Sequence, residues 1–216
     1  MERNQDHMKF HSITGALALV LGAAACGTDE DGGRGNLQLS LSGEEAAEVG
    51  FPVPGSEELR FADGWSVRFD KYLVGIGNVR VAGGDGSVAV QDDEVIVTDL
   101  TAGEQAIFRF EGLGARRWDR FGYDILAPDA GARSVGTVAE ADLQRMVDGG
   151  YNYWIEGIAE KDGDAVSFAW GIAAPMHNDD CVNSADGSPG VVIRNNATAA
   201  MASKRIFTPS WAPSRS

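Results

Sequence analysis

The sequence predicts an all-β domain, an antiparallel β-sandwich of about ten strands with one short helix. Short runs of alternating apolar and polar residues fill most of the chain, and turn-forming residues separate them at about the 8 to 12 residue spacing of sandwiches. The chain lacks the regular alternation of strands and helices that indicates a parallel sheet. Because it has 216 residues, 44% of them hydrophobic, it can bury a stable core without disulfides or metals.

The first strands show the clearest alternation. The run NLQLSLS at 36–42 places three leucines on one face and polar residues on the other, which is the pattern of a half-buried strand. A second run begins at Trp65 and continues to Val81, where two glycines indicate a bulge or a sharp bend. Three more strands are predicted within residues 95–125.

Two tetrapeptides predict hairpins. GGDG at 83–86 lies between two apolar runs, and KDGD at 161–164 separates the runs 151–160 and 165–172. In the second hairpin we expect the large apolar residues of the returning strand to face the core. These residues are Val166, Phe168, Trp170 and Ile172.

One segment has a helical period. TVAE at 137–140 predicts a capping box, apolar residues recur on one face, and Gly149 and Gly150 supply a C-terminal stop. We therefore expect one helix at about 138–148.

The domain is expected to span residues 37–195, with a last strand at 191–193. No acidic residue follows Asp186, and the ending KRIFTPSWAPSRS has two prolines and no periodicity. Residues 196–216 are therefore predicted to form an irregular basic tail. The alternative is that a frameshift replaced the native ending and left the sandwich without its last strand.

The N-terminus has the features of a signal peptide. Residues 13–25 read ITGALALVLGAAA, an uncharged run of about 20 Å if helical, which is shorter than the ~30 Å hydrocarbon core of a membrane. Residues 1–25 are therefore expected to be removed. A start at Met8 gives a better-formed peptide, with Lys9 as its charged residue.

The stretch LGAAAC at 21–26 resembles the lipobox of bacterial lipoproteins. In that family the cysteine, here Cys26, is diacylated on sulfur, and its amino group is acylated after cleavage. The resemblance implies a permanent membrane anchor, and residues 26–36 then form a lipidated start and a flexible acidic, glycine-rich tether. Gly27 resembles the default signal of gram-negative lipoproteins for the outer membrane, whereas Ala23 stands where the family most often has leucine.

The charge of the chain excludes one class of function. The sequence has 32 acidic and 18 basic residues, which gives a formal net charge of −14. Phosphate backbones repel such a protein, so nucleic-acid binding is excluded as its main activity. If Cys26 carries lipid, Cys181 has no partner in the chain and the fold contains no disulfide.

The loop 175–190 is the richest in metal-ligand side chains. We interpret His177 and Cys181 as candidate nitrogen and sulfur ligands of Cu or Zn, with Asp179 and Asp180 as oxygen ligands or as partners of the imidazole. The spacing matches no standard metal motif. The alternative is a polar loop of turn-forming residues.

A second candidate site is a basic corner in an otherwise acidic domain. Arg116, Arg117, Trp118 and Arg120 combine arginine with tryptophan, which is typical of contact surfaces for a partner. The alternative is a strand corner whose arginines neutralise neighbouring aspartates. Catalysis is not expected, because His177 is the only histidine left after signal removal and no G-x-S-x-G motif supplies a nucleophile.

Three segments resemble a group of bacterial lipoproteins that have no assigned function: residues 63–83, 116–125 and 166–192. In that group a stretch rich in His and Asp follows the last strand, where this chain has ATAAMASKRIF. The resemblance implies that His177 and Cys181 are half of a metal site whose other half is missing here.

The sequence thus predicts a lipid-anchored binding or interaction protein of the cell envelope, on the outer membrane of a gram-negative bacterium, and not an enzyme. Its expected partner is an unknown protein or small molecule, or a transition metal held by the loop 175–190. One alternative is a structural or partner-docking lipoprotein without a small ligand. The other is a hydrolase of envelope carbohydrate, which needs two acidic residues facing each other across a cleft.

Overall fold

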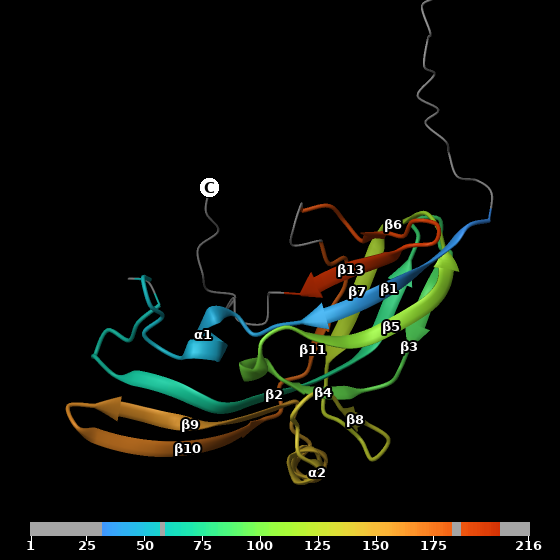
Figure 1. Ribbon diagram of the computed structural model, residues 1–216. Helices are drawn as coiled ribbons and strands as arrows, with labels where there is room; N and C mark the ends of the chain where they lie inside the picture. Colours follow the sequence, from blue (N-terminus) through green and yellow to red (C-terminus); the bar gives the residue numbers. More distant parts are fainter. Residues whose placement is uncertain (1–31, 57–58, 183–186, 204–216) are drawn as a thin grey trace, which may run out of the picture.

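The structure is a computed structural model that describes residues 32–56, 59–182 and 187–203. Strands make up 51% of these residues and helices 11%, so the prediction of a β protein is confirmed. Two larger sheets and one strand pair carry the fold (Figure 1). The predicted signal peptide and Cys26 lie outside the described residues.

The smaller of the two larger sheets has three strands. β1 (Arg34–Leu41) lies in its centre, antiparallel to β5 (Gln105–Gly114) and parallel to β13 (Thr198–Ser203). The alternate leucines of β1 are at most 4% exposed, which confirms the face predicted for this strand. β1 begins at Arg34, three residues before the expected start of the domain.

The larger sheet is built around one long strand. Its members are β2 (Ser66–Ala82), β3 (Val88–Asp92), β4 (Ile96–Asp99), β7 (Arg120–Ile125), β8 (Arg133–Ser134), β9 (Tyr153–Lys161), β10 (Asp164–Ile172) and β11 (Met176–Asn178). The main path runs β10-β9-β2-β4-β8, while β3 and β7 also pair with β2, and β11 pairs with β7. A separate antiparallel pair joins β6 (Arg117–Trp118) to β12 (Val191–Val192).

The sheets are mixed, so the prediction of a purely antiparallel arrangement is wrong. β13 runs parallel to β1, and β8 runs parallel to β4. Parallel neighbours come from distant parts of the chain, and local alternation of side chains does not encode such pairings. The described residues form thirteen strands rather than about ten, because several are only two or three residues long.

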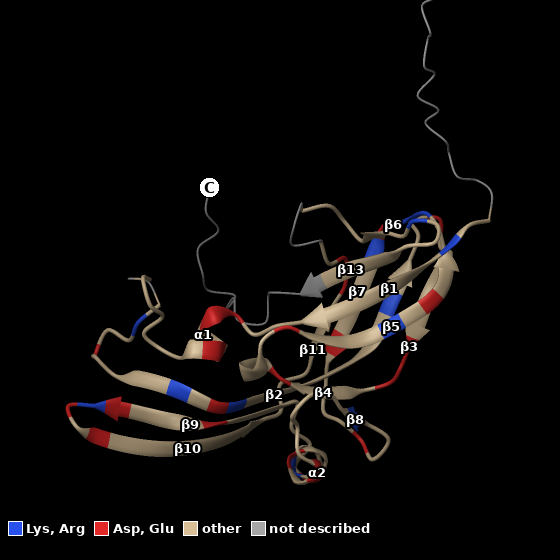
Figure 2. Ribbon diagram, in the orientation of Figure 1, with Lys and Arg blue, Asp and Glu red and all other residues tan. Residues whose placement is uncertain are grey.

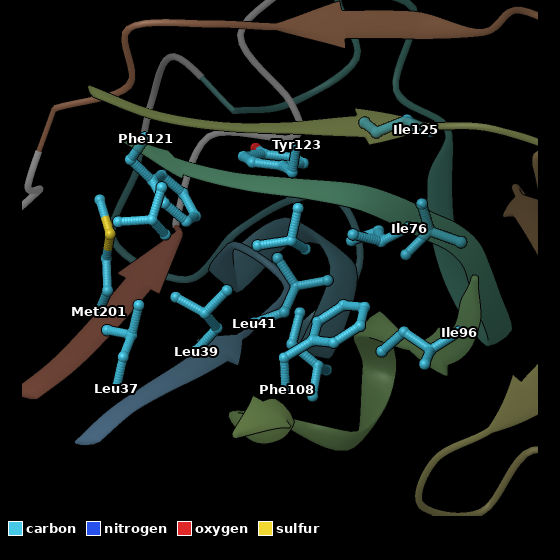
Figure 3. Close-up of a cluster of buried hydrophobic side chains, with 14 of the residues drawn as sticks. Leu37, Leu39, Leu41, Ile76, Ile96, Phe108, Phe121, Tyr123, Ile125 and Met201 are labelled. Atoms are coloured by element: carbon cyan, nitrogen blue, oxygen red, sulfur yellow. The ribbon is translucent and has the colours of Figure 1, made fainter. Parts of the chain in front are cut away.

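The main core lies between β1 on one side and β2 and β7 on the other (Figure 3). The leucines of β1 point toward Ile76 of β2 and toward Phe121 and Tyr123 of β7 (Figure 3). β13 adds Met201, which is 5% exposed. A second, smaller cluster joins Leu143 and Met146 to the other face of the larger sheet.

The described residues contain two α-helices and one 3₁₀ helix: α1 (Glu45–Val49), η1 (Leu100–Ala102) and α2 (Glu140–Gly149). The helix expected at 138–148 is confirmed as α2, but α1 is an addition to the one helix predicted. The capping box does not form, because the N-cap is Ala139 and no side chain caps the helix. The glycine stop is confirmed, because Gly150 adopts the left-handed conformation and donates its N–H to Met146 and Val147. None of these helices is long and apolar enough to cross a membrane.

Both predicted hairpins form. β2 and β3 pair antiparallel on either side of the glycine turn at 83–86, and β9 and β10 pair antiparallel around Asp162 and Gly163. The latter two residues have positive φ angles of 52° and 94°, which a tight two-residue hairpin requires.

The fold continues beyond residue 195, which is the predicted C-terminal boundary of the domain. Residues 198–203 form β13 within the fold, and Met201 lies opposite Leu39 of β1. The region expected to be an irregular or aberrant tail from 196 therefore supplies an edge strand and a buried core side chain. Residues 204–216 lie outside the described part of the chain.

Candidate functional site

The loop predicted to bind metal lies along β7. β11 places His177 opposite Asp124, and the N–H of Cys181 donates to the carbonyl of Phe121. The strand pairing therefore brings an aspartate of β7 to the histidine, which the sequence did not indicate, because Asp124 and His177 are far apart in the chain.

Four side chains form a polar cluster, here called the His177 cluster: Arg80, Asp124, His177 and Asp179. The imidazole Nδ1 lies 2.7 Å from Asp124 Oδ1, and Nε2 lies 2.7 Å from Asp179 Oδ2. Arg80 Nη2 donates to both carboxylates, at 3.0 Å and 2.9 Å. An imidazole that faces a carboxylate at each nitrogen donates at both only as the protonated imidazolium.

The pKa values in this cluster follow from these contacts. The carboxylates of Asp179 and Asp124 raise the pKa of His177 above its usual 6.5. Hydrogen bonds from Arg80 and His177 lower the pKa of Asp179. Burial alone would raise the pKa of Asp124, but hydrogen bonds from Asn78 and Arg80 outweigh it and lower that pKa. Arg80 therefore forms ion pairs with both carboxylates, and the imidazole adds two more when it is protonated.

These shifts predict a pH window for the stability that the cluster contributes. The contribution of His177 is complete below about pH 6.5 and is lost as the pH rises through its raised pKa, whereas the carboxylates contribute above about pH 4 and lose their contribution on acidification. We expect the urea midpoint of the wild type to exceed that of His177→Gln most at pH 5–6, and the gap to narrow as the pH rises above 6.5 toward 9. An equal gap at every pH from 5 to 9 would show that the imidazolium is not involved.

The four residues predicted as metal ligands do not converge. Cys181 packs against the main core, and burial raises the pKa of its thiol. Asp180 instead pairs with Arg120 at 3.4 Å. Among the described residues no group of three or more His, Cys, Asp or Glu side chains could hold a metal ion. The two carboxylates bound to His177 lie at opposite ring nitrogens, with Arg80 between them, so they share no point with it where an ion could sit.

A cavity beside Cys181 is too small for a ligand. Its lining is apolar and includes Leu39, Ile76 and Phe121, and its volume is about 40 Å³, which is room for little more than a water molecule.

Arg116 and Arg117 of the basic corner bind other groups of the same chain. Arg116 pairs with Asp85 and lies 4.0 Å above the ring of Trp118, and Arg117 donates to the carbonyl of Pro189. The sequence suggested that these arginines neutralise aspartates next to them in the chain, whereas Arg116 pairs with the more distant Asp85. Trp118 is 6% exposed and donates to the carbonyl of Gly114. Its predicted role as a surface contact is wrong, because the strand pair β6–β12 holds its ring in the core.

The structure exposes a different apolar surface, on β10. Ten large hydrophobic side chains are exposed among the described residues, and four of them lie in β10 or shortly after it: Val166, Trp170, Ile172 and Met176. The expectation that this face of β10 is core is therefore wrong for Val166, Trp170 and Ile172, whereas Phe168 is half-buried and packs against the main core. Period-two alternation identifies the two faces of a strand, but it does not say whether another layer covers either face.

The aromatic rings on this face are held in place. Phe168 stacks on Trp170, with ring centroids 4.5 Å apart, and forms a T-shaped pair with Phe69 of β2, with ring centroids 6.2 Å apart. The ring of Phe168 crosses Gly157 of β9, where a Cβ would lie 2.7 Å from it. Trp170 is nevertheless 56% exposed. The result is an aromatic surface of mutually packed rings that solvent reaches through Trp170.

β10 also leaves one edge of the sheet open. It ends the strand order and, within the described residues, pairs only with β9. Apart from Asp164 at its first position, the strand has no charged residue (Figure 2). Natural edge strands are commonly protected by charges, prolines or bulges, and β10 between 165 and 172 has no charge and no proline.

Comparisons with protein-family models, with curated proteins and with solved structures find no match to this chain. The resemblance to bacterial lipoproteins therefore stays a prediction from the residues quoted above. The candidate site rests on the geometry of the chain itself.

Proposed function

We propose that the chain is a lipid-anchored interaction protein of the cell envelope that binds a partner through β10. The observation that carries this proposal is the combination, on one strand, of an unpaired edge and an exposed aromatic face. Exposed apolar surface on a folded domain marks interaction sites, and tryptophan is enriched among the residues that contribute most to binding.

An open edge gives a specific mode of binding. A partner strand that adds to β10 makes main-chain hydrogen bonds along its length, and alternate side chains then meet Val166, Phe168 and Trp170. Because these rings are already ordered by Gly157 and Phe69, binding loses little side-chain entropy. Burying the exposed indole of Trp170 contributes favourably through the hydrophobic effect.

The position of the strand suits an anchored protein. β9, β10 and the first half of β2 form an arm at one end of the molecule, and β1 begins at the opposite end (Figure 1). Lipidation at Cys26, with a tether that ends where β1 begins at Arg34, puts the anchor at the β1 end of the molecule in this proposal. The arm then projects from the end of the domain opposite to the tether, which leaves β10 accessible to a partner.

The other features predicted from the sequence have structural roles in this proposal or less support than β10. We propose that the two larger sheets pack as a sandwich, with the arm as an extension of one sheet beyond the shared core. The His177 cluster and the basic corner serve the fold in this proposal, because their charged groups are paired within the chain. Binding of Cu or Zn by the loop 175–190 has less support, because Cys181 and Asp180 have other partners.

Site-specific photo-crosslinking in cells tests the proposal. A photoreactive amino acid replaces Ser167, which is exposed on β10, or Val88, which is 62% exposed on β3. We expect covalent adducts of defined mass from position 167 and none from position 88. No adduct at 167, or equal adducts at both positions, would show that β10 is not a binding surface.

A further inference from the structure

We propose that the partner bound at β10 is a second copy of this chain, paired antiparallel about a two-fold axis that passes Ala169. This inference rests on the proposed function, because it uses the same strand. The two arms then form one continuous sheet in the order β2-β9-β10, followed by β10, β9 and β2 of the second copy.

The sequence of β10 is self-complementary in this register. A two-fold axis at Ala169 places Phe168 opposite the partner's Trp170, and Val166 opposite the partner's Ile172. All four are large and lie on the same face of β10, where Phe168 is half-buried and the other three are exposed. Directly opposite residues in an antiparallel pair have their side chains in contact, and aromatic pairs are among the most favourable.

The residues on the opposite face of β10 are also complementary to those of the second copy in this register. Its residues are small, and in the same register Ser167 lies opposite the partner's Gly171, while Ala169 lies opposite itself. Two backbones can therefore approach to the normal spacing of a sheet without a clash. A two-fold interface uses the same patch twice and must be complementary to itself, and β10 meets this requirement on both faces.

Charge favours this strand as the meeting point of two copies. The chain carries a net charge of −14, so most surfaces of two copies repel each other. Between residues 165 and 172 there is no charge, and the register keeps the two Asp164 carboxylates at opposite ends of the new pair. The nearest acid on β9 is Glu156, opposite Ala169, and Lys71 and Arg145 pair with it.

The proposed register predicts a specific disulfide. Opposite residues in an antiparallel pair have Cα atoms about 4.5–5.5 Å apart, which a disulfide can bridge. Ala169→Cys in the full-length lipidated chain, with Cys181→Ala to remove the other thiol, should therefore form a covalent dimer in isolated membranes treated with copper phenanthroline. A dimer band at twice the monomer mass on non-reducing gels is the expected result.

Ala165→Cys is the matched control, because Ala165 lies on the same strand and face as Ala169 and is also exposed. In the proposed register the two copies of residue 165 are about 27 Å apart, at ~3.4 Å per residue. We expect at least about tenfold less dimer from this variant, since its sulfurs are out of reach. Equal dimer from both variants indicates random collision and overturns the proposal.

The two proposals can fail separately. If neither cysteine variant dimerises, the second copy is not the partner. Adducts of position 167 with a different protein in the photo-crosslinking experiment would then leave the proposed function standing, and the absence of any adduct would remove both.

Discussion

Replacing Cys26 with serine is expected to move the protein from the membrane fraction to the soluble fraction. In the proposed anchor the lipid is attached through the sulfur of Cys26, so serine removes the acceptor atom. Each buried CH₂ group contributes about 0.8 kcal/mol to membrane binding, and several acyl chains make the anchor effectively permanent. We expect incorporation of labelled palmitate to fall to background in this variant.

Cys181→Ser is the matched control, because it removes the only other thiol. It should remain in the membrane fraction and keep its palmitate label. Retention of label by Cys26→Ser, or its loss from Cys181→Ser, would contradict acylation at position 26 and with it the membrane location.

Met201→Asp is expected to give the largest loss of stability. Met201 is 5% exposed in β13, opposite Leu39, and lines the core with Phe121. An aspartate there is a buried charge without a partner, which lowers the free energy of unfolding by about 3 to 5 kcal/mol. Urea denaturation followed by tryptophan fluorescence measures the change.

Ala200→Asp tests the same strand on its exposed side. Ala200 precedes Met201 and points to solvent, so its replacement should change the free energy of unfolding by less than about 0.5 kcal/mol. If Met201→Asp is equally harmless, β13 is not part of the fold, and the prediction of an aberrant ending after residue 195 regains support.

Local features of the fold could be predicted from the sequence. The leucines of β1, the turn at Asp162 and Gly163, and the stop of α2 at Gly150 each depend on a few neighbouring residues. Their conformations follow from side-chain period and from the backbone angles that each residue permits. These predictions were accurate to within a few residues.

Long-range features could not be predicted. The parallel pairing of β13 with β1 joins segments about 160 residues apart, as Leu37↔Ala199 illustrates, and the short, small-residue sequence TAAMAS has no strand pattern of its own. Likewise, His177 and Asp179 were found as candidates, but Asp124 and Arg80 come from other strands. The contacts with these two residues place the imidazole of His177 beside carboxylates and Arg80 rather than beside the Cys181 thiol.

The exposure of β10 is a third feature of the fold, and it could not be predicted from the sequence. Its large and small residues alternate as the sequence predicts, yet Trp170 is exposed rather than buried. Burial depends on a covering layer, and the arm extends beyond the core shared by the two larger sheets (Figure 1). An apolar strand face without a cover was the feature that the sequence alone could not distinguish from core.

The yield of photo-crosslinked adduct at Ser167 in living cells, measured with Trp170 intact and with Trp170→Lys, tests whether β10 binds a partner. We expect a strong adduct in the first chain and its loss in the second, while the free energy of unfolding changes by no more than about 1 kcal/mol because residue 170 is largely exposed. An adduct of equal yield in both chains, or none in either, would contradict the claim that β10 binds a partner.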